Sequence, residues 1–219
     1  MKNIVTIAIC TLFLFSCRNN EANGKFTVTG DIKNAPDQKI FLEELFFSGK
    51  DPEVLDTEEV KNGHFTVSGI APDEGMYRLR LEKFNNGFLF INDKPDINFT
   101  ADLNDPSLSG PSFNTPANDL LKNFIVSIDA QQNSITTGSS HLDELKDKYA
   151  SDTSKAADSI VNAAKNKYAL TTATFKKYII NYIDSSSDPV MTMFALGYIR
   201  DIDPTELEKP VNNLLTPFS

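Results

Sequence analysis

Cysteine is almost absent from this sequence. Its 219 residues include two cysteines, Cys10 and Cys17, and both stand near the start of the chain. The chain after Cys17 therefore has no thiol with which to form a disulfide, bind zinc through sulfur or exchange disulfides by itself. Thiol chemistry is excluded for that part of the chain, whatever its fold.

Positive charge is also in short supply. Lysine and arginine number 21 against 30 aspartates and glutamates, which gives a net charge of -9. Nucleic-acid-binding domains gather Lys and Arg on one surface, and no basic patch occurs here, so we expect no nucleic-acid partner. The acidic balance also disfavours electrostatic docking on anionic lipid. With 40% hydrophobic residues, the chain has enough apolar material for one large or two small folded domains.

One apolar run stands at the very start. Residues 1–16 have the features of a signal peptide, because Lys2 supplies positive charge and residues 4–15 form an apolar stretch too short to span a bilayer. We expect this segment to be removed. Residues 17–24 would then form a polar tether ahead of the first predicted strand.

The end of the segment, Leu14-Phe15-Ser16-Cys17, resembles the lipobox of bacterial lipoproteins, although Phe15 is bulkier than usual at its position. The resemblance implies cleavage between Ser16 and Cys17 and acylation of the Cys17 thiol, which makes the lipid membrane a partner. The implied location is the cell envelope, facing the periplasm, with the outer membrane favoured over the inner. The alternative is a plain secretory signal with an incidental cysteine.

The strongest structural signal is Asn62-Gly63, which predicts a tight hairpin turn because both residues tolerate the positive φ that such a turn needs. Alternating apolar and polar residues recur on both sides of it, in about eight short segments separated by turn residues. The predicted strands cover residues 25–32, 39–47, 54–60, 64–68, 77–81, 88–91, 97–102 and 107–110. This spacing predicts an antiparallel β sandwich or open barrel over residues 25–110. The segments 39–47 and 88–91 are apolar on both faces, so both faces should be covered.

Residues 111–219 change to helical spacing, and the fold class is therefore α+β. Asn114 or Thr115-Pro116 is expected to cap a first helix, whose apolar stripe runs to Ile128. We expect a loop at 133–140, a long helical stretch from 142 to 183 with a break at Thr171-Thr172, and short helices at 190–200 and 204–215. The abrupt apolar end of the sequence suggests a truncation; the alternative is a natural end tucked against the helices.

The run from residue 25 to 110 resembles the uncharacterised β domain that opens thioredoxin-like, thiol-disulfide interchange lipoproteins of the cell envelope. The matching segments are Phe26-Thr27-Val28-Thr29-Gly30-Asp31-Ile32, Ile40-Phe41-Leu42-Glu43-Glu44-Leu45, residues 55–69 and Gly75-Met76-Tyr77-Arg78-Leu79-Arg80-Leu81. The helical part is similar to the connector that follows in that family. A thioredoxin domain with a Trp-Cys-x-x-Cys site usually comes next, but this sequence has no tryptophan and no cysteine after Cys17.

The resemblance implies a non-catalytic, membrane-anchored accessory region that holds a thioredoxin-like domain or another envelope protein as its partner. No catalytic residue and no cofactor are expected. The alternative is a stand-alone lipoprotein that binds a glycan or a peptide with its β sandwich.

Arg78 and Arg80 are the candidate residues for a ligand or partner face. They alternate with Tyr77, Leu79 and Leu81 and so share one face of a predicted strand. Two neighbouring guanidinium groups suit an anionic ligand. The alternative is that they pair with acids on a neighbouring strand.

Other polar residues support no site. His141 precedes Asp143 and Glu144, but further metal ligands are missing and a helix start explains the acids better. His64 is expected at the exposed face beside a turn. The pairs Glu43-Glu44 and Glu58-Glu59 cannot converge, because neighbours on a strand point to opposite faces, and solvated edges are expected. Three tyrosines of the helical stripe are expected in the core rather than in a sugar platform: Tyr168, Tyr178 and Tyr182.

Overall fold

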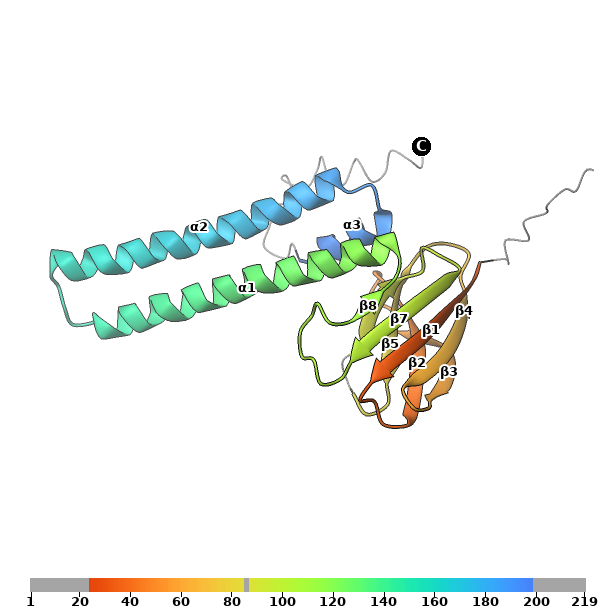
Figure 1. Cartoon of the computed structure of the whole chain (residues 1–219). Coiled ribbons are helices and arrows are strands. Elements are labelled where there is room, and N and C mark those ends of the chain that lie inside the picture. The colour runs from red at the N-terminus through yellow and green to blue at the C-terminus, as the bar shows by residue number, and fades with distance from the viewer. Residues whose placement is uncertain (1–23, 85–86, 199–219) are drawn as a thin grey trace, which may run out of the picture.

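The computed structural model describes residues 24–84 and 87–198 (Figure 1). Eight strands form two sheets of four, and three helices follow. The strands are β1 (Lys25–Lys33), β2 (Gln38–Leu45), β3 (Glu53–Val60), β4 (His64–Ile70), β5 (Met76–Leu81), β6 (Phe88–Ile91), β7 (Asp96–Asp102) and β8 (Ser112–Phe113). The predicted α+β class and the sandwich are confirmed, and the two sheets are open rather than closed into a barrel.

The two sheets have the strand orders β4-β1-β7-β8 and β3-β2-β5-β6. Neighbouring strands are antiparallel except for β1 and β7, which pair in parallel with Val28 opposite Ile97. The strand expected at 107–110 was wrong. Those residues lie in a loop, and the last strand is β8, where Phe113 pairs with Phe99 of β7.

Asn62-Gly63 joins the two sheets at one side of the sandwich. Both residues have the predicted positive φ, 51° and 84°. Lys61 and His64 exchange backbone hydrogen bonds across the turn, after which β3 pairs with β2 in one sheet and β4 with β1 in the other. The turn therefore closes one side of the sandwich and leaves β6 and β8 as the edges of the opposite side.

The sandwich core contains the inward-facing residues that the alternation predicted. Tyr77, Leu79 and Leu81 of β5 are buried there, and Phe90 of β6 packs among several other aromatic rings. Burial raises the pKa of the Tyr77 hydroxyl to about 12, with Glu44 adding to the effect. Arg78 and Arg80 alternate with these residues and lie on the outer face of the same sheet.

Two long antiparallel helices, α1 (Pro116–Lys148) and α2 (Lys155–Ser185), project from the sandwich in Figure 1 as a hairpin that we call the arm. With 33 residues, α1 is about 50 Å long. A short helix, α3 (Pro189–Leu196), returns to the base of the arm, and the Asp188 carboxylate caps its first turn. None of the described helices is long and apolar enough to cross a membrane.

The helix boundaries differ from the sequence prediction at two places. The loop expected at 133–140 was wrong, because α1 runs through it. The break expected at Thr171-Thr172 was also wrong, because both hydroxyls donate to carbonyl oxygens four residues back and the helix continues. The chain turns at residues 149–154 instead, where Ser154 caps α2 by accepting a hydrogen bond from the Ala157 N–H.

The start of α1 agrees with the prediction, since Thr115 takes the N-cap position and Pro116 follows it. The helix predicted at 190–200 corresponds to α3, which ends at Leu196. Three predictions lie outside the described residues. They are the signal peptide, the tether from Cys17 up to residue 23, and the helix at 204–215.

Candidate functional site

Asn118, in the first turn of α1, fastens the arm to the sandwich. Its side-chain oxygen accepts a hydrogen bond from the Ile91 N–H, and its amide nitrogen donates to the Ile91 carbonyl oxygen, both at 2.8 Å. The same nitrogen donates to the Thr115 hydroxyl at 2.7 Å. Asp93 accepts from the Ala117 N–H at 3.1 Å and so caps the helix from the sandwich side. Asn118 therefore occupies the place that a neighbouring strand would take at the edge of β6.

An apolar cluster surrounds this joint. It combines Met76 and Ile91 from the outer face of the sheet with Phe124 of α1, Ile179 of α2 and Met191 of α3, all buried. Phe90 lies in the sandwich core and Ile91 in the cluster at the joint, so β6 is covered on both faces as expected. The arm and the sandwich thus share one continuous apolar contact.

Arg78 and Arg80 are both paired with Glu43 of β2. The Arg78 Nε and the Arg80 Nε each donate to one oxygen of the Glu43 carboxylate at 2.7 Å. The Glu43 side chain is 5% exposed, against 27% for Arg78 and 28% for Arg80. The structure therefore contains the alternative given for these arginines: they pair with an acid on the neighbouring strand.

The expectation of a solvated Glu43-Glu44 pair was wrong for Glu43, which is buried. The two arginines of β5 cover it, and the Arg80 guanidinium also lies over the Phe41 ring at 4.2 Å from its centroid. The second face of β2 is therefore covered partly by this ion cluster and partly, at Leu45, by the cluster at the joint.

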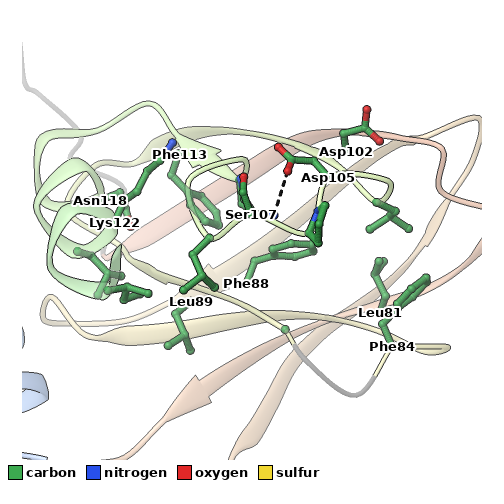
Figure 2. Close-up of a pocket in the computed structure, with 17 residues that line it drawn as sticks. Leu81, Phe84, Phe88, Leu89, Asp102, Asp105, Ser107, Phe113, Asn118 and Lys122 are labelled. Carbon is green, nitrogen blue, oxygen red and sulfur yellow. Dashed lines mark hydrogen bonds between the residues drawn. The ribbon is translucent and has the colours of Figure 1, made fainter. Parts of the chain in front are cut away.

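A cavity of about 700 Å³ lies at the open side of the sandwich, between β6, β8, the first turns of α1 and the loop at 103–111 (Figure 2). Phe88 and Leu89 of β6, Phe113 of β8 and Leu121 of α1 supply much of its apolar lining. Its volume falls in the range of small-molecule and peptide sites. The cavity exists because Asn118 holds α1 beside β6 while the loop passes over the gap between the sheets.

Lys122 and Asp102 lie at opposite ends of this cavity. Figure 2 shows Lys122 beside Asn118 at one end, Asp102 toward the other end, and Asp105 between them near Ser107. Hydrogen bonds from the Asn104 N–H and the Asn34 amide lower the pKa of the Asp102 carboxyl, which is therefore charged at neutral pH. The Asp105 carboxylate accepts from the Ser107 N–H at 2.9 Å and shapes the loop.

The remaining candidates lie apart from this cavity. His64 is exposed beside Asp31, and His141 is exposed in the last part of α1 rather than at a helix start, so that part of the prediction was wrong. Among residues 24–84 and 87–198, no group of His, Cys, Asp and Glu is suited to hold a metal. Glu58 and Glu59 are exposed as expected.

The three tyrosines singled out on the helices are half-buried in α2. Tyr178 and Tyr182 pack against Phe124, and burial raises the pKa of Tyr182 to about 12. The rings of Tyr178 and Tyr182 thus belong to the packing at the base of the arm, as predicted, whereas Tyr168 is not among the residues of that cluster.

The cavity was not predicted from the sequence. Its one visible signal was the strand at residues 88–91, which is apolar on both faces, and this pattern indicated a need for cover without showing what supplies it. The contribution of the loop at 103–111 and of Asn118 depends on contacts between distant segments, which have no local pattern.

Fold and joint together define a class: a two-sheet β sandwich with a helical arm fastened at its open side. The chain belongs to the family described as a domain of unknown function, DUF4369, whose model matches residues 26–145, more than half of the 219-residue chain. The matched range covers the sandwich and most of α1, so the first helix of the arm is part of the family domain. No curated protein and no solved structure matches the chain.

Proposed function

We propose that this protein is the non-catalytic, membrane-tethered accessory region of a thioredoxin-like envelope lipoprotein. The observation that carries the proposal is the joint at Asn118, which fastens a helical arm of about 50 Å to the sandwich and makes the two parts a spacer of defined shape. A lipid on Cys17 would hold the sandwich at the membrane. The absence of cysteine after Cys17 favours a non-catalytic role for this chain, in which the partner carries out the redox chemistry.

The chain by itself is expected to have no disulfide reductase activity. Purified protein beginning at residue 18 contains no thiol, so the rate of insulin reduction by dithiothreitol should be the same with and without it. A thioredoxin added at equal concentration is the positive control. Turnover that scales with the concentration of this chain would contradict the non-catalytic assignment.

Cys17 is expected to carry the lipid anchor. In a bacterial host, the full-length protein should incorporate radiolabelled palmitate and sediment with the membrane fraction, because its acyl chains together make anchoring stable. Cys17→Ala should lose both the label and the membrane fraction. Cys10→Ala is the matched control and should keep both, since that residue leaves with the signal peptide. Label that persists in Cys17→Ala would contradict the lipoprotein assignment.

A second function, ligand binding by the sandwich, is favoured by one specific observation. The cavity at the open side is mainly apolar and carries a few charged groups, which is the usual composition of a binding site. This role is compatible with a tether, because a membrane-held module can capture a ligand or a partner segment.

A further inference from the structure

The edge of β6 that faces the cavity has unpaired backbone groups. In an antiparallel pair, the N–H and C=O of one residue point to the partner strand and those of the next residue point away from it. Ile91 uses both groups for Asn118, away from β5. Leu89 stands two residues earlier, so its N–H and C=O point to the same outer side.

Leu89 also lines the cavity, and no described residue bonds its outward N–H or C=O. An edge strand with free backbone groups is a template for a further strand. At Ile91 both outward backbone groups already bond the Asn118 side chain, which takes the place of a strand residue. At Leu89 the same edge of β6 borders the cavity.

The lining on either side of this edge suits apolar side chains. Phe88 and Phe113 of the sandwich and Leu121 and Ile125 of α1 line the cavity. A sugar would leave most of its hydroxyls without partners against such a surface. An extended peptide instead uses its backbone for the Leu89 groups and its side chains for the apolar walls.

The charges of the cavity are separated along its length. Lys122 follows Asn118 by one helical turn, and Figure 2 shows Asp102 on the far side of Phe88 and Leu89 from these two residues, with Asp105 between. Lys122 has no acidic partner among the described residues. An extended segment with a basic residue at the aspartate side and an acidic residue at the Lys122 side complements both charges, whichever way its chain runs along β6.

We propose that the cavity binds a short, extended, apolar peptide segment that pairs with β6 at Leu89, with a basic residue beside Asp102 and Asp105 and an acidic residue beside Lys122. The inference rests on the ligand-binding role proposed above and specifies the class of ligand.

Two blocked peptides of equal composition test the proposal by titration calorimetry with the protein beginning at residue 18. The probe is acetyl-Lys-Val-Leu-Val-Glu-amide, and its matched control is acetyl-Val-Lys-Leu-Glu-Val-amide, whose charges stand too close together to reach both ends of the cavity in either direction. The probe is expected to bind at least about tenfold more tightly, because only its charges reach both ends of the site. Equal binding of the two peptides, or tighter binding of the control, overturns the proposal.

Two variants locate the binding. Leu89→Pro removes the outward N–H, which the fold does not use, so the variant should remain folded by circular dichroism and bind the probe at least about tenfold more weakly. Lys122→Glu leaves the backbone intact and should reverse the preference at one end, so that acetyl-Lys-Val-Leu-Val-Lys-amide becomes the better ligand. Probe affinity unchanged in Lys122→Glu overturns the proposal even if Leu89→Pro fails to fold.

A dye separates failure of the peptide proposal from failure of the binding role. Anilinonaphthalene sulfonate should fluoresce in the cavity, and Ser107→Trp, which places a large ring at its lining, should suppress the signal. If the dye binds in this way and neither peptide does, the peptide proposal is overturned and the ligand-binding role stands. If Ser107→Trp leaves both dye and peptide binding unchanged, both are overturned.

Discussion

Replacement of both Arg78 and Arg80 by alanine is expected to lower the free energy of unfolding by about 3–5 kcal/mol. The two guanidinium groups are the cations that the structure places on Glu43, whose side chain is 5% exposed. Without them the carboxylate would be buried without a partner, and burial of an uncompensated charge is strongly unfavourable. Urea denaturation followed by circular dichroism measures the change.

Two controls separate the buried charge from other effects of the substitutions. Adding Glu43→Leu to the double variant removes the unpaired charge and should recover most of the lost stability. Lys50→Ala breaks an exposed ion pair with Glu53 in the same domain and should cost less than about 1 kcal/mol. A double variant within about 1 kcal/mol of the natural protein would show that this cluster does not stabilise the fold.

Asn118→Ala is expected to lower the free energy of unfolding by about 2–4 kcal/mol, because it leaves the buried N–H and C=O of Ile91 without partners. Asn118 is 4% exposed, so water cannot easily replace the lost bonds. Denaturation in urea again measures the total. Hydrogen exchange should also show faster exchange of the Ile91 amide, because its N–H loses the Asn118 oxygen as acceptor.

The matched control for this prediction is Asn123→Ala, which makes the same chemical change at an exposed position of the same helix. It should change stability by no more than about 0.5 kcal/mol. Equal effects of the two substitutions would mean that the hydrogen bonds of Asn118 do not fasten the arm.

Local patterns predicted the sandwich well because the alternation of apolar and polar residues in each strand indicates which side chains are buried. Tyr77, Leu79 and Leu81 alternate with arginines, and the structure buries the first set and places the second on the outer face. Asn62-Gly63 adopted the positive φ values that the sequence indicated. That its two strands separate into different sheets is a matter of partner choice, which no local pattern encodes.

The wrong predictions have the same origin. Alternation correctly placed Glu43 and Glu44 on opposite faces, but it gave no information on whether a face would be covered. The register that sets Glu43 opposite Arg78 joins residues 35 positions apart and depends on how β2 and β5 pair. The polar residues at 133–140 resemble a loop by composition, but α1 continues through them although most of their side chains are exposed. Composition is a weak guide to where a helix ends.

The arm would turn a small movement at its base into a large movement at its far end. Because α1 begins at the joint and extends for about 50 Å, a rotation of about 10° at Asn118 would move the far end of the arm by about 9 Å. A small rearrangement at the edge of β6, where the cavity also lies, would thus be amplified at a distance. The molecule has the geometry of a lever whose fulcrum adjoins the cavity beside β6.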